Sequence, residues 1–155
     1  MPDAFHKITT AQLAYARCID DGKLEEWPDF FVDDCKYVVT TERNYRQGLE
    51  AGVIWADSRA MLRDRVSSLQ EANIYGPHKY RHILSAPCIL RQDDEEVQSE
   101  TSFLIVRTIN DGPMDIFCSG RYVDHYQIKN DVVKIRERIV VCDSSHFHTL
   151  LAIPL

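Results

Sequence analysis

Residues 97–109 have the sequence VQSETSFLIVRTI and residues 114–128 have the sequence MDIFCSGRYVDHYQI, with NDGP at 110–113 between them. Both long segments are rich in β-branched and aromatic residues, which favour strands. Asn-Asp-Gly-Pro is typical of a tight turn, and a short turn joins strands that pair antiparallel. This part of the chain therefore predicts a long β-hairpin around which the fold is built.

Two more strands are expected beside this hairpin, at 79–90 and at 132–142, and short polar turns again separate the neighbours. Strands of about a dozen residues must twist strongly or contain a bulge, and Gly120 is the expected site of a bend. In the last strand apolar side chains alternate with basic ones. One side is predicted to carry Val133, Ile135, Ile139 and Val141, and the other Lys134, Arg136 and Arg138.

The first half of the chain is predicted to be mainly helical, because its apolar residues recur at helical spacing. Thr9 or Thr10 is a candidate cap for the first helix, Gly22 ends it, and Ser58 is a candidate cap for the last. Helices followed by a meander of strands predict an α+β domain, whose N-terminal and central helices cover a strongly curved antiparallel sheet. Helices are expected at 5–19, 23–31 and 58–73, a strand at 35–41 and a polar connection at 42–52.

The bulk properties indicate one globular domain that spans residues 1–155. The net charge of −6 argues against electrostatic capture of nucleic acid or of an anionic membrane. No apolar run approaches the roughly 18 to 20 residues that span a bilayer, and the N-terminal segment lacks the apolar core of a secretory signal. The five cysteines are widely spaced and expected to stay reduced, so we expect a cytoplasmic protein.

Several short segments stand out along the chain: Tyr15-Ala16, Trp27-Pro28, Asp34-Cys35, Asp64-Arg65-Val66, Tyr80-Arg81-His82-Ile83, Gly120-Arg121-Tyr122 with Asp124, and Cys142-Asp143-Ser144. Together, in order and in spacing, they resemble the small (β) subunits of aromatic-ring-hydroxylating dioxygenases. The resemblance runs from about Phe5 to Leu155. Within the family, residues 55–58 and 71–75 are most similar to the small subunit of terephthalate 1,2-dioxygenases, with salicylate hydroxylases close behind.

The resemblance implies a conical sheet of the nuclear-transport-factor-2 type that packs beside a catalytic large (α) subunit, usually as an α3β3 hexamer. In that family the large subunit holds a Rieske [2Fe-2S] cluster and a mononuclear Fe(II), and a reductase supplies electrons from NADH. The small subunit is structural. The implied reaction is cis-dihydroxylation, with O2, of a carboxylated aromatic acid, with terephthalate as the expected substrate.

Iron binding by this chain itself is not expected. A Rieske cluster needs a C-x-H and a C-x-x-H motif, and none of the five cysteines begins either one. Cys142 is followed by His146, one residue too far. His146 and His148 with Asp143 are the only local candidates for a site of two histidines and one carboxylate, and a surface or subunit-contact role suits them better.

An enzymatic alternative remains open, because similar cones in other families are dehydratases and isomerases that use a His–Asp pair. General acid–base catalysis would need a histidine held by a carboxylate. The candidates for such a site are His82, Asp20, Asp124, Tyr37 and Tyr122. A third hypothesis is a homodimeric binding protein for a small apolar ligand.

The contact with the large subunit is predicted from arginines and large apolar residues, which are over-represented at binding hot spots. For the strand arginines, pairing within the chain and contact with the partner both remain open. The apolar segment 150–155 is expected to be buried, either along its own sheet or between subunits. The predicted interface residues are Trp55, Asp57, Arg59, Arg65, Arg81, Arg121, Arg138 and Leu155.

Overall fold

The computed structural model describes residues 3–48, 54–72, 78–144 and 154–155. Helix α1 (Ala4–Asp20) is capped by Asp3, whose carboxylate accepts a hydrogen bond of 2.9 Å from the backbone N–H of His6. The predicted internal cap is wrong, because the Thr9 hydroxyl donates to the carbonyl of Phe5 one turn back within the helix. Gly22 follows the helix with a φ of 75°, as expected for a residue that ends one.

Three shorter helices accompany α1 within the residues that the structure describes. The predicted helix at 23–31 is a 3-10 helix, η1 (Leu24–Phe30), with Pro28 inside it. The proline ring and its missing N–H oppose α-helical bonding at this position. Helix α3 (Arg59–Ala72) follows Ser58, whose hydroxyl accepts from the backbone N–H of Met61, so the predicted cap is confirmed. The expected polar connection contains helix α2 (Glu42–Arg46).

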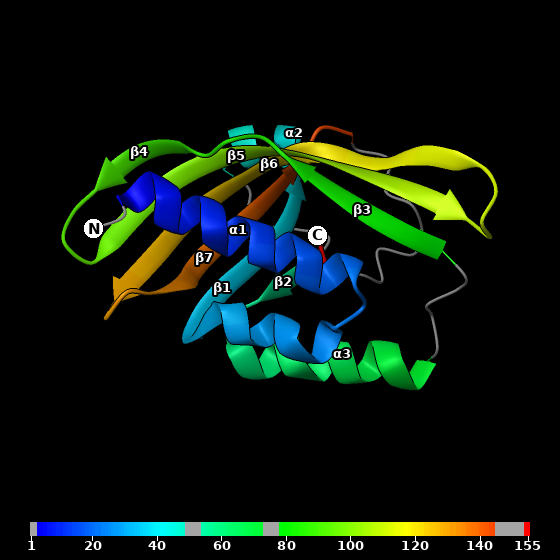
Figure 1. Ribbon diagram of the computed structural model, residues 1–155, viewed down its shortest axis with the longest axis horizontal. Helices are drawn as coiled ribbons and strands as arrows, with labels where there is room; N and C mark the ends of the chain where they lie inside the picture. The colour runs from blue at the N-terminus through cyan, green and yellow to red at the C-terminus, as the bar shows by residue number, and fades with distance from the viewer. Residues whose placement is uncertain (1–2, 49–53, 73–77, 145–153) are drawn as a thin grey trace.

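In the described part of the chain, seven strands form one curved, unclosed sheet in the order β2-β1-β7-β6-β5-β3, and β4 also pairs with β5 (Figure 1). The predicted hairpin is confirmed as β5 and β6, and the α+β fold class is confirmed. Figure 1 shows α1 lying across one face of the sheet, with η1 and α3 beside β1. The strands are β1 (Phe31–Thr41), β2 (Ile54–Ala56), β3 (His78–Leu84), β4 (Cys88–Gln92), β5 (Glu96–Ile109), β6 (Met114–Lys129) and β7 (Val132–Cys142).

The sheet is mixed, whereas the strand pattern predicted antiparallel pairing throughout. Strand β1 pairs parallel with β7, the last strand in the sequence. Short turns constrain only neighbours in the chain, so they do not determine how this distant pair is oriented. The predicted strand at 79–90 is two strands, β3 and β4, with Pro87 in the interruption, because proline lacks the N–H that a continuous ladder needs.

A β-bulge in β7 reverses the alternation that the sequence pattern predicted. His125 pairs with Glu137, but the next residue, Tyr126, pairs with Ile135, so Arg136 is an extra residue. An extra residue moves every later side chain to the opposite face. Ile135 and Arg138 are therefore both buried, and the predicted placement of Arg138 on the face opposite Ile135 is wrong.

Gly120 is required by a close approach of β6 to β7. A Cβ atom at this position would lie 2.1 Å from the carbonyl oxygen of Val141. The expected irregularity lies nearby rather than at Gly120 itself, because the register between β5 and β6 shifts between Ile105 and Val106. The glycine thus allows close strand packing, and a separate bulge accommodates the twist.

Aromatic side chains fill the interior between the sheet and the helices. Trp27 makes edge contacts with Phe31 and Tyr37, at ring-centroid distances of 5.5 and 5.2 Å. Tyr122 stacks on Phe103 at 4.7 Å. These residues come from η1, β1, β5 and β6, so the concave side of the sheet is a packed core.

Candidate functional site

The candidate His–Asp pair does form, between the end of α1 and strand β3. The Nδ1 atom of His82 lies 2.7 Å from Oδ1 of Asp20, and the backbone N–H of His82 donates to Oδ2 of Asp20 at 2.9 Å. The His82 ring is completely buried, and its Nε2 atom has no hydrogen-bond partner among the described residues. One carboxylate therefore ties a helix end to an edge strand, and the imidazole faces packed protein.

Asp124 belongs to a different cluster, centred on Arg138. The guanidinium donates to both carboxylate oxygens of Asp124 at 2.8 Å, and to the Tyr126 hydroxyl at 2.7 Å. The Tyr126 hydroxyl in turn donates to Asp124 and accepts from Gln12 of α1. The side chains of Arg138 and Asp124 are both about fully buried, at 1% and 0% exposure.

Two tyrosine rings enclose the guanidinium of Arg138. Its central carbon lies 4.3 Å from the ring centroid of Tyr15 and 3.9 Å from that of Tyr122, as in cation–π contacts. Burial lowers the pKa of Arg138, but the Asp124 carboxylate and the tyrosines raise it, and the net result is well above the ordinary value. Burial also raises the pKa of Tyr122 well above its ordinary value, so this phenol stays protonated.

Tyr37 holds the backbone of Leu155. Its hydroxyl accepts from the Leu155 N–H at 3.0 Å and donates to the Leu155 carbonyl at 3.3 Å. The Tyr15 hydroxyl donates to the same carbonyl at 2.7 Å. The candidate acid–base residues therefore do not converge: His82 pairs with Asp20, Asp124 with Arg138, and Tyr37 with Leu155.

The predicted interface residues divide into buried and accessible ones. Arg138 and Leu155 are fully buried in the chain's own core, which corrects their assignment to a partner contact. Arg121 pairs with Glu100 and Glu42, and Arg59 pairs with Asp33 and donates to the Phe31 carbonyl. Arg65 is partly buried. The accessible candidates are Trp55, Asp57 and Arg81.

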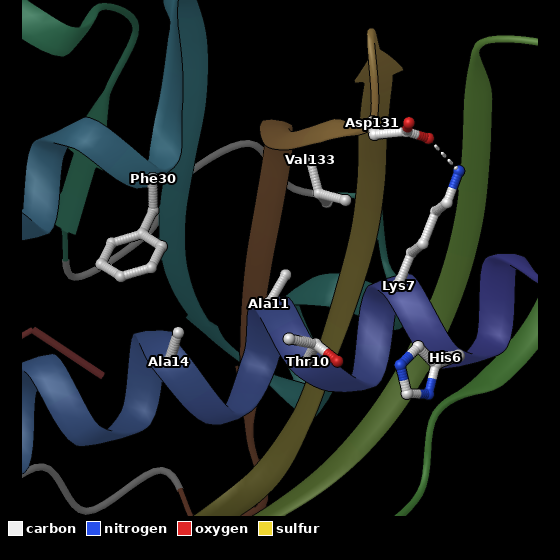
Figure 2. A pocket seen from close by; sticks show the side chains of 8 residues that line it. All are labelled: His6, Lys7, Thr10, Ala11, Ala14, Phe30, Asp131 and Val133. Atoms are coloured by element: carbon white, nitrogen blue, oxygen red, sulfur yellow. Dashed lines mark hydrogen bonds and ion pairs between the residues drawn. The ribbon is translucent and has the colours of Figure 1, made fainter. Parts of the chain in front are cut away.

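A groove of about 520 Å³ lies between α1, Phe30 of η1 and the start of β7 (Figure 2). Ala11 and Ala14 of α1 line it together with Phe30 and Val133. At one end the Lys7 ammonium is paired with the Asp131 carboxylate (Figure 2), at a distance of 2.9 Å. The groove is mainly apolar, and its cation is already paired.

Neither a metal cluster nor a membrane-spanning helix is found in the described residues. Within 3–48, 54–72, 78–144 and 154–155, no three His, Cys, Asp or Glu side chains are grouped to hold a metal ion. His146 and His148 lie outside these ranges, so the candidate segment around Asp143 is only partly described. Over the same ranges, no helix has both the length and the apolar character for crossing a bilayer.

A family model described as "Ring hydroxylating beta subunit" matches residues 14–149. The chain belongs to this family. The resemblance seen in the sequence is thereby confirmed, and the protein is a β subunit of the ring-hydroxylating dioxygenases, which are oxidoreductase complexes. Such β subunits belong to the terminal oxygenase component.

Relatives match over nearly the full length of the chain. It is 44% identical to subunit beta 2 of the terminal oxygenase component of terephthalate 1,2-dioxygenase from Comamonas sp, covering 96% of this chain and 97% of the relative. It is 36% identical to the anthranilate 1,2-dioxygenase small subunit from Burkholderia cepacia, covering 96% and 92%.

Solved structures agree with the family and the fold. A protein described as the β subunit of an aromatic-ring-hydroxylating dioxygenase from Novosphingobium aromaticivorans has a TM-score of 0.91 at 38% identity, covering 98% of this chain and 97% of the other. A protein from the same organism described as a scytalone dehydratase has a TM-score of 0.69 at 19% identity, covering 92% and 87%. This second similarity shows only that the cone fold is shared.

Sequence reasoning missed Gln12 and Tyr126, which complete the Arg138 cluster. Gln12 lies on the buried side of α1, and its amide donates to the Thr101 hydroxyl at 2.7 Å. The available signal was a polar residue on the apolar face of a helix, where it needs a buried partner. The bulge at Arg136 left no comparable signal, since it depends on the pairing of two strands.

Proposed function

We propose that this chain is the structural β subunit of a terminal oxygenase that cis-dihydroxylates a carboxylated aromatic acid, with terephthalate as the first substrate to test. It acts in the cytoplasm as part of an α3β3 hexamer. The large subunit holds the Rieske [2Fe-2S] cluster and the mononuclear Fe(II), and a reductase delivers electrons from NADH.

The observation that carries this proposal is the 44% identity to the terephthalate dioxygenase β subunit across nearly the whole of both chains. The anthranilate enzyme's small subunit is a second relative named for a substrate with a carboxylate on an aromatic ring. The proposed substrate class follows from what these two relatives share.

The packed interior supports a structural role. Two polar groups that line the cone are engaged within the chain: the Arg138 guanidinium with the Asp124 carboxylate, and the Tyr37 hydroxyl with the backbone of Leu155. These are contacts that stabilise a core, and burial keeps the Tyr122 phenol from ionising. The chain would then contribute a folded surface to the complex and leave the oxygen chemistry to the large subunit.

Co-expression tests the proposal. A Rieske-type large subunit from the same genome, co-expressed with this chain, should co-purify with it in equal amounts. With the reductase, NADH and O2, the complex should convert terephthalate to a cis-diol that mass spectrometry detects. Turnover by this chain alone, or a complex that forms but oxidises no carboxylated aromatic acid, would contradict it.

The alternative of a stand-alone dehydratase or isomerase rests on the His82–Asp20 distance of 2.7 Å. It predicts activity of the isolated chain that is lost in His82→Gln and depends on pH. The complete burial of the His82 ring favours a structural tie instead. Assays of the isolated chain with hydroxylated aromatic substrates distinguish the two.

A further inference from the structure

Two cysteines from neighbouring strands meet where β7 ends. Cys142, the last residue of β7, pairs with Gly120 of β6, and Cys118 lies two residues before Gly120 on the same strand. Side chains two residues apart in a strand share a face, so Cys118 is a diagonal neighbour of Cys142. Their Sγ atoms are 3.4 Å apart, close enough for one thiol to donate a hydrogen bond to the other sulfur.

Gly120 makes this contact possible. A Cβ atom there would lie 3.0 Å from the Cα of Cys142 and closer still to the Val141 carbonyl, so the strands approach closely and no side chain of Gly120 stands between the thiols. Two hydrogen bonds of 2.9 Å hold the strands together beside the pair. The Ser119 hydroxyl donates to the Asp143 carboxylate, and the Asp143 N–H donates to the Ser119 carbonyl.

The two thiols are not equivalent. Cys118 is partly exposed, whereas Cys142 is buried at 1% exposure. A hydrogen bond from the Cys142 thiol lowers the pKa of Cys118 below its ordinary value, against the opposing effects of burial and of the Asp143 carboxylate. The same contact, together with burial, raises the pKa of Cys142. Cys118 is therefore the thiol that ionises first and that a small oxidant reaches first, with a protonated Cys142 beside it.

This arrangement is typical of oxidation-sensitive thiol pairs, in which one accessible thiolate is oxidised and a neighbouring thiol resolves the product. The other three cysteines, Cys18, Cys35 and Cys88, lie apart from the pair on α1, β1 and β4. All five are free thiols. In a reducing compartment a disulfide between two such neighbours would be transient, as redox-sensing disulfides are.

We propose that Cys118 and Cys142 are a reversible oxidation site, at which hydrogen peroxide converts the two thiols into a disulfide that joins β6 to the end of β7. The Cys118 thiolate attacks one peroxide oxygen, which forms a sulfenic acid and releases hydroxide. The Cys142 sulfur then displaces the hydroxyl group of the sulfenic acid, and its proton leaves with that group as water. In total the two thiols lose two electrons and two protons, and one peroxide becomes two molecules of water.

The site is built from this chain alone, so it is independent of the proposed function. The sulfurs must approach from 3.4 Å to about 2.05 Å, the length of a disulfide bond, and rotation of the two short side chains brings them together. The close contact of β6 and β7 at Gly120 fixes the rest of the geometry before any oxidant arrives.

The test is treatment of the reduced, folded chain with hydrogen peroxide, then alkylation of the remaining thiols, digestion with trypsin and mass spectrometry without reductant. Trypsin should release Cys118 in the peptide 108–121 and Cys142 in the peptide that begins at Ile139. The two should appear as one linked species, lighter than their sum by two hydrogen atoms, which dithiothreitol separates. The folded chain should form it at least about tenfold faster than the chain unfolded in urea, because folding holds the sulfurs together.

Variants separate the roles of the two thiols. Cys142→Ala should leave the Cys118 sulfenic acid without a resolving thiol, so that dimedone labels the peptide 108–121. Cys118→Ser should abolish the linked species. Cys88→Ser is the matched control, because Cys88 is an exposed thiol on β4, and it should form the linked species at the wild-type rate. The wild-type measurement needs no mutation, so it decides the proposal even where a variant is less stable.

The melting temperature of the oxidised chain is a second readout. A bond between β6 and β7 restricts the unfolded chain, so oxidation should raise the melting temperature by about 5 °C or more, and dithiothreitol should reverse the change. A lower melting temperature would show that the strands must distort to form the bond, and it would overturn the proposal. Oxidation of Cys88 without any linked species, equal rates of linkage in folded and unfolded chains, or conversion of Cys118 to a sulfinic acid while Cys142 stays reduced would also overturn it.

Discussion

On the inner side of the sheet Arg138 and Asp124 are buried together, whereas on the outer side of β3, β5 and β6 the apolar residues Ile83, Met114 and Ile116 are exposed. The two inner charges pair with each other, and Arg138 also donates to the Tyr126 hydroxyl. The three outer apolar side chains have few covering groups within the chain. The difference shows that the interior of the chain is fully packed, whereas part of its surface still exposes apolar side chains. This is expected for a subunit that is stable before it meets its partner.

The largest effect on stability is expected from breaking the inner ion pair. Arg138→Met should leave Asp124 buried without a cation and lower the free energy of unfolding by about 3–5 kcal/mol. Urea denaturation of the isolated chain measures this. Arg121→Met is the control, because Arg121 forms a more exposed ion pair worth about 1 kcal/mol or less. Equal losses in the two variants would remove the distinction between the inner and outer charges.

A smaller but still large effect is expected at Leu155. Leu155→Ala removes a completely buried side chain and should cost about 2–4 kcal/mol. The matched control is Leu13→Ala on the exposed side of α1, which should change stability by less than about 0.5 kcal/mol. If thermal unfolding does not separate the two variants, Leu155 is not part of the core in solution.

The reactivity of the cysteine thiols should distinguish a buried position from an exposed one without any mutation. Burial raises the pKa of the Cys35 thiol to about 11, and Cys88 is exposed. Only the thiolate reacts, so at pH 8 ionisation alone should slow Cys35 by about a hundredfold relative to a thiol of ordinary pKa. Alkylation followed by peptide mass spectrometry should label Cys88 first. Labelling of Cys35 should rise with pH up to about 11, and comparable rates at pH 8 would contradict the burial.

The smallest effect is expected on the outer side. Ile116→Ser in the isolated chain should change the free energy of unfolding by less than about 0.5 kcal/mol, because the side chain is already exposed to water. Ile105→Ser is the contrast, since Ile105 is fully buried in the neighbouring strand and its replacement should destabilise strongly. A large loss in Ile116→Ser would mean that the Ile116 side chain is covered by the chain itself.

Local patterns predicted most of the elements, because helix periodicity, caps and short turns act over a few residues. Ser58 and Gly22 are confirmed in their predicted roles, and the hairpin of β5 and β6 follows from its turn. The parallel pairing of β1 with β7 and the bulge at Arg136 depend on strands brought together by the tertiary fold. Such long-range pairings leave no trace in the local alternation.

For the candidate site too, local patterns predicted the residue types, and long-range pairing decided how they are arranged. The approach of His82 to Asp20 was anticipated as a pair of residue types, but their separation from Asp124 and Tyr37 was not. Arg138 was placed on the wrong face because the alternation was extended through the bulge. The exposed side chains of Met114 and Ile116 lay in a segment with apolar residues on both faces, and only the strand register shows which of them remain uncovered.

The parallel partnership of β1 and β7 also bears on how the chain is made. Val39 lies beside Val140, roughly a hundred residues later in the sequence. A ribosome must therefore synthesise the chain as far as β7 before β1 gains its neighbour on that side, and contacts of such long range form slowly. Nascent chains that lack β7 will leave one backbone edge of β1 unpaired, so chaperone binding during translation is expected to end only when residues up to 142 have emerged.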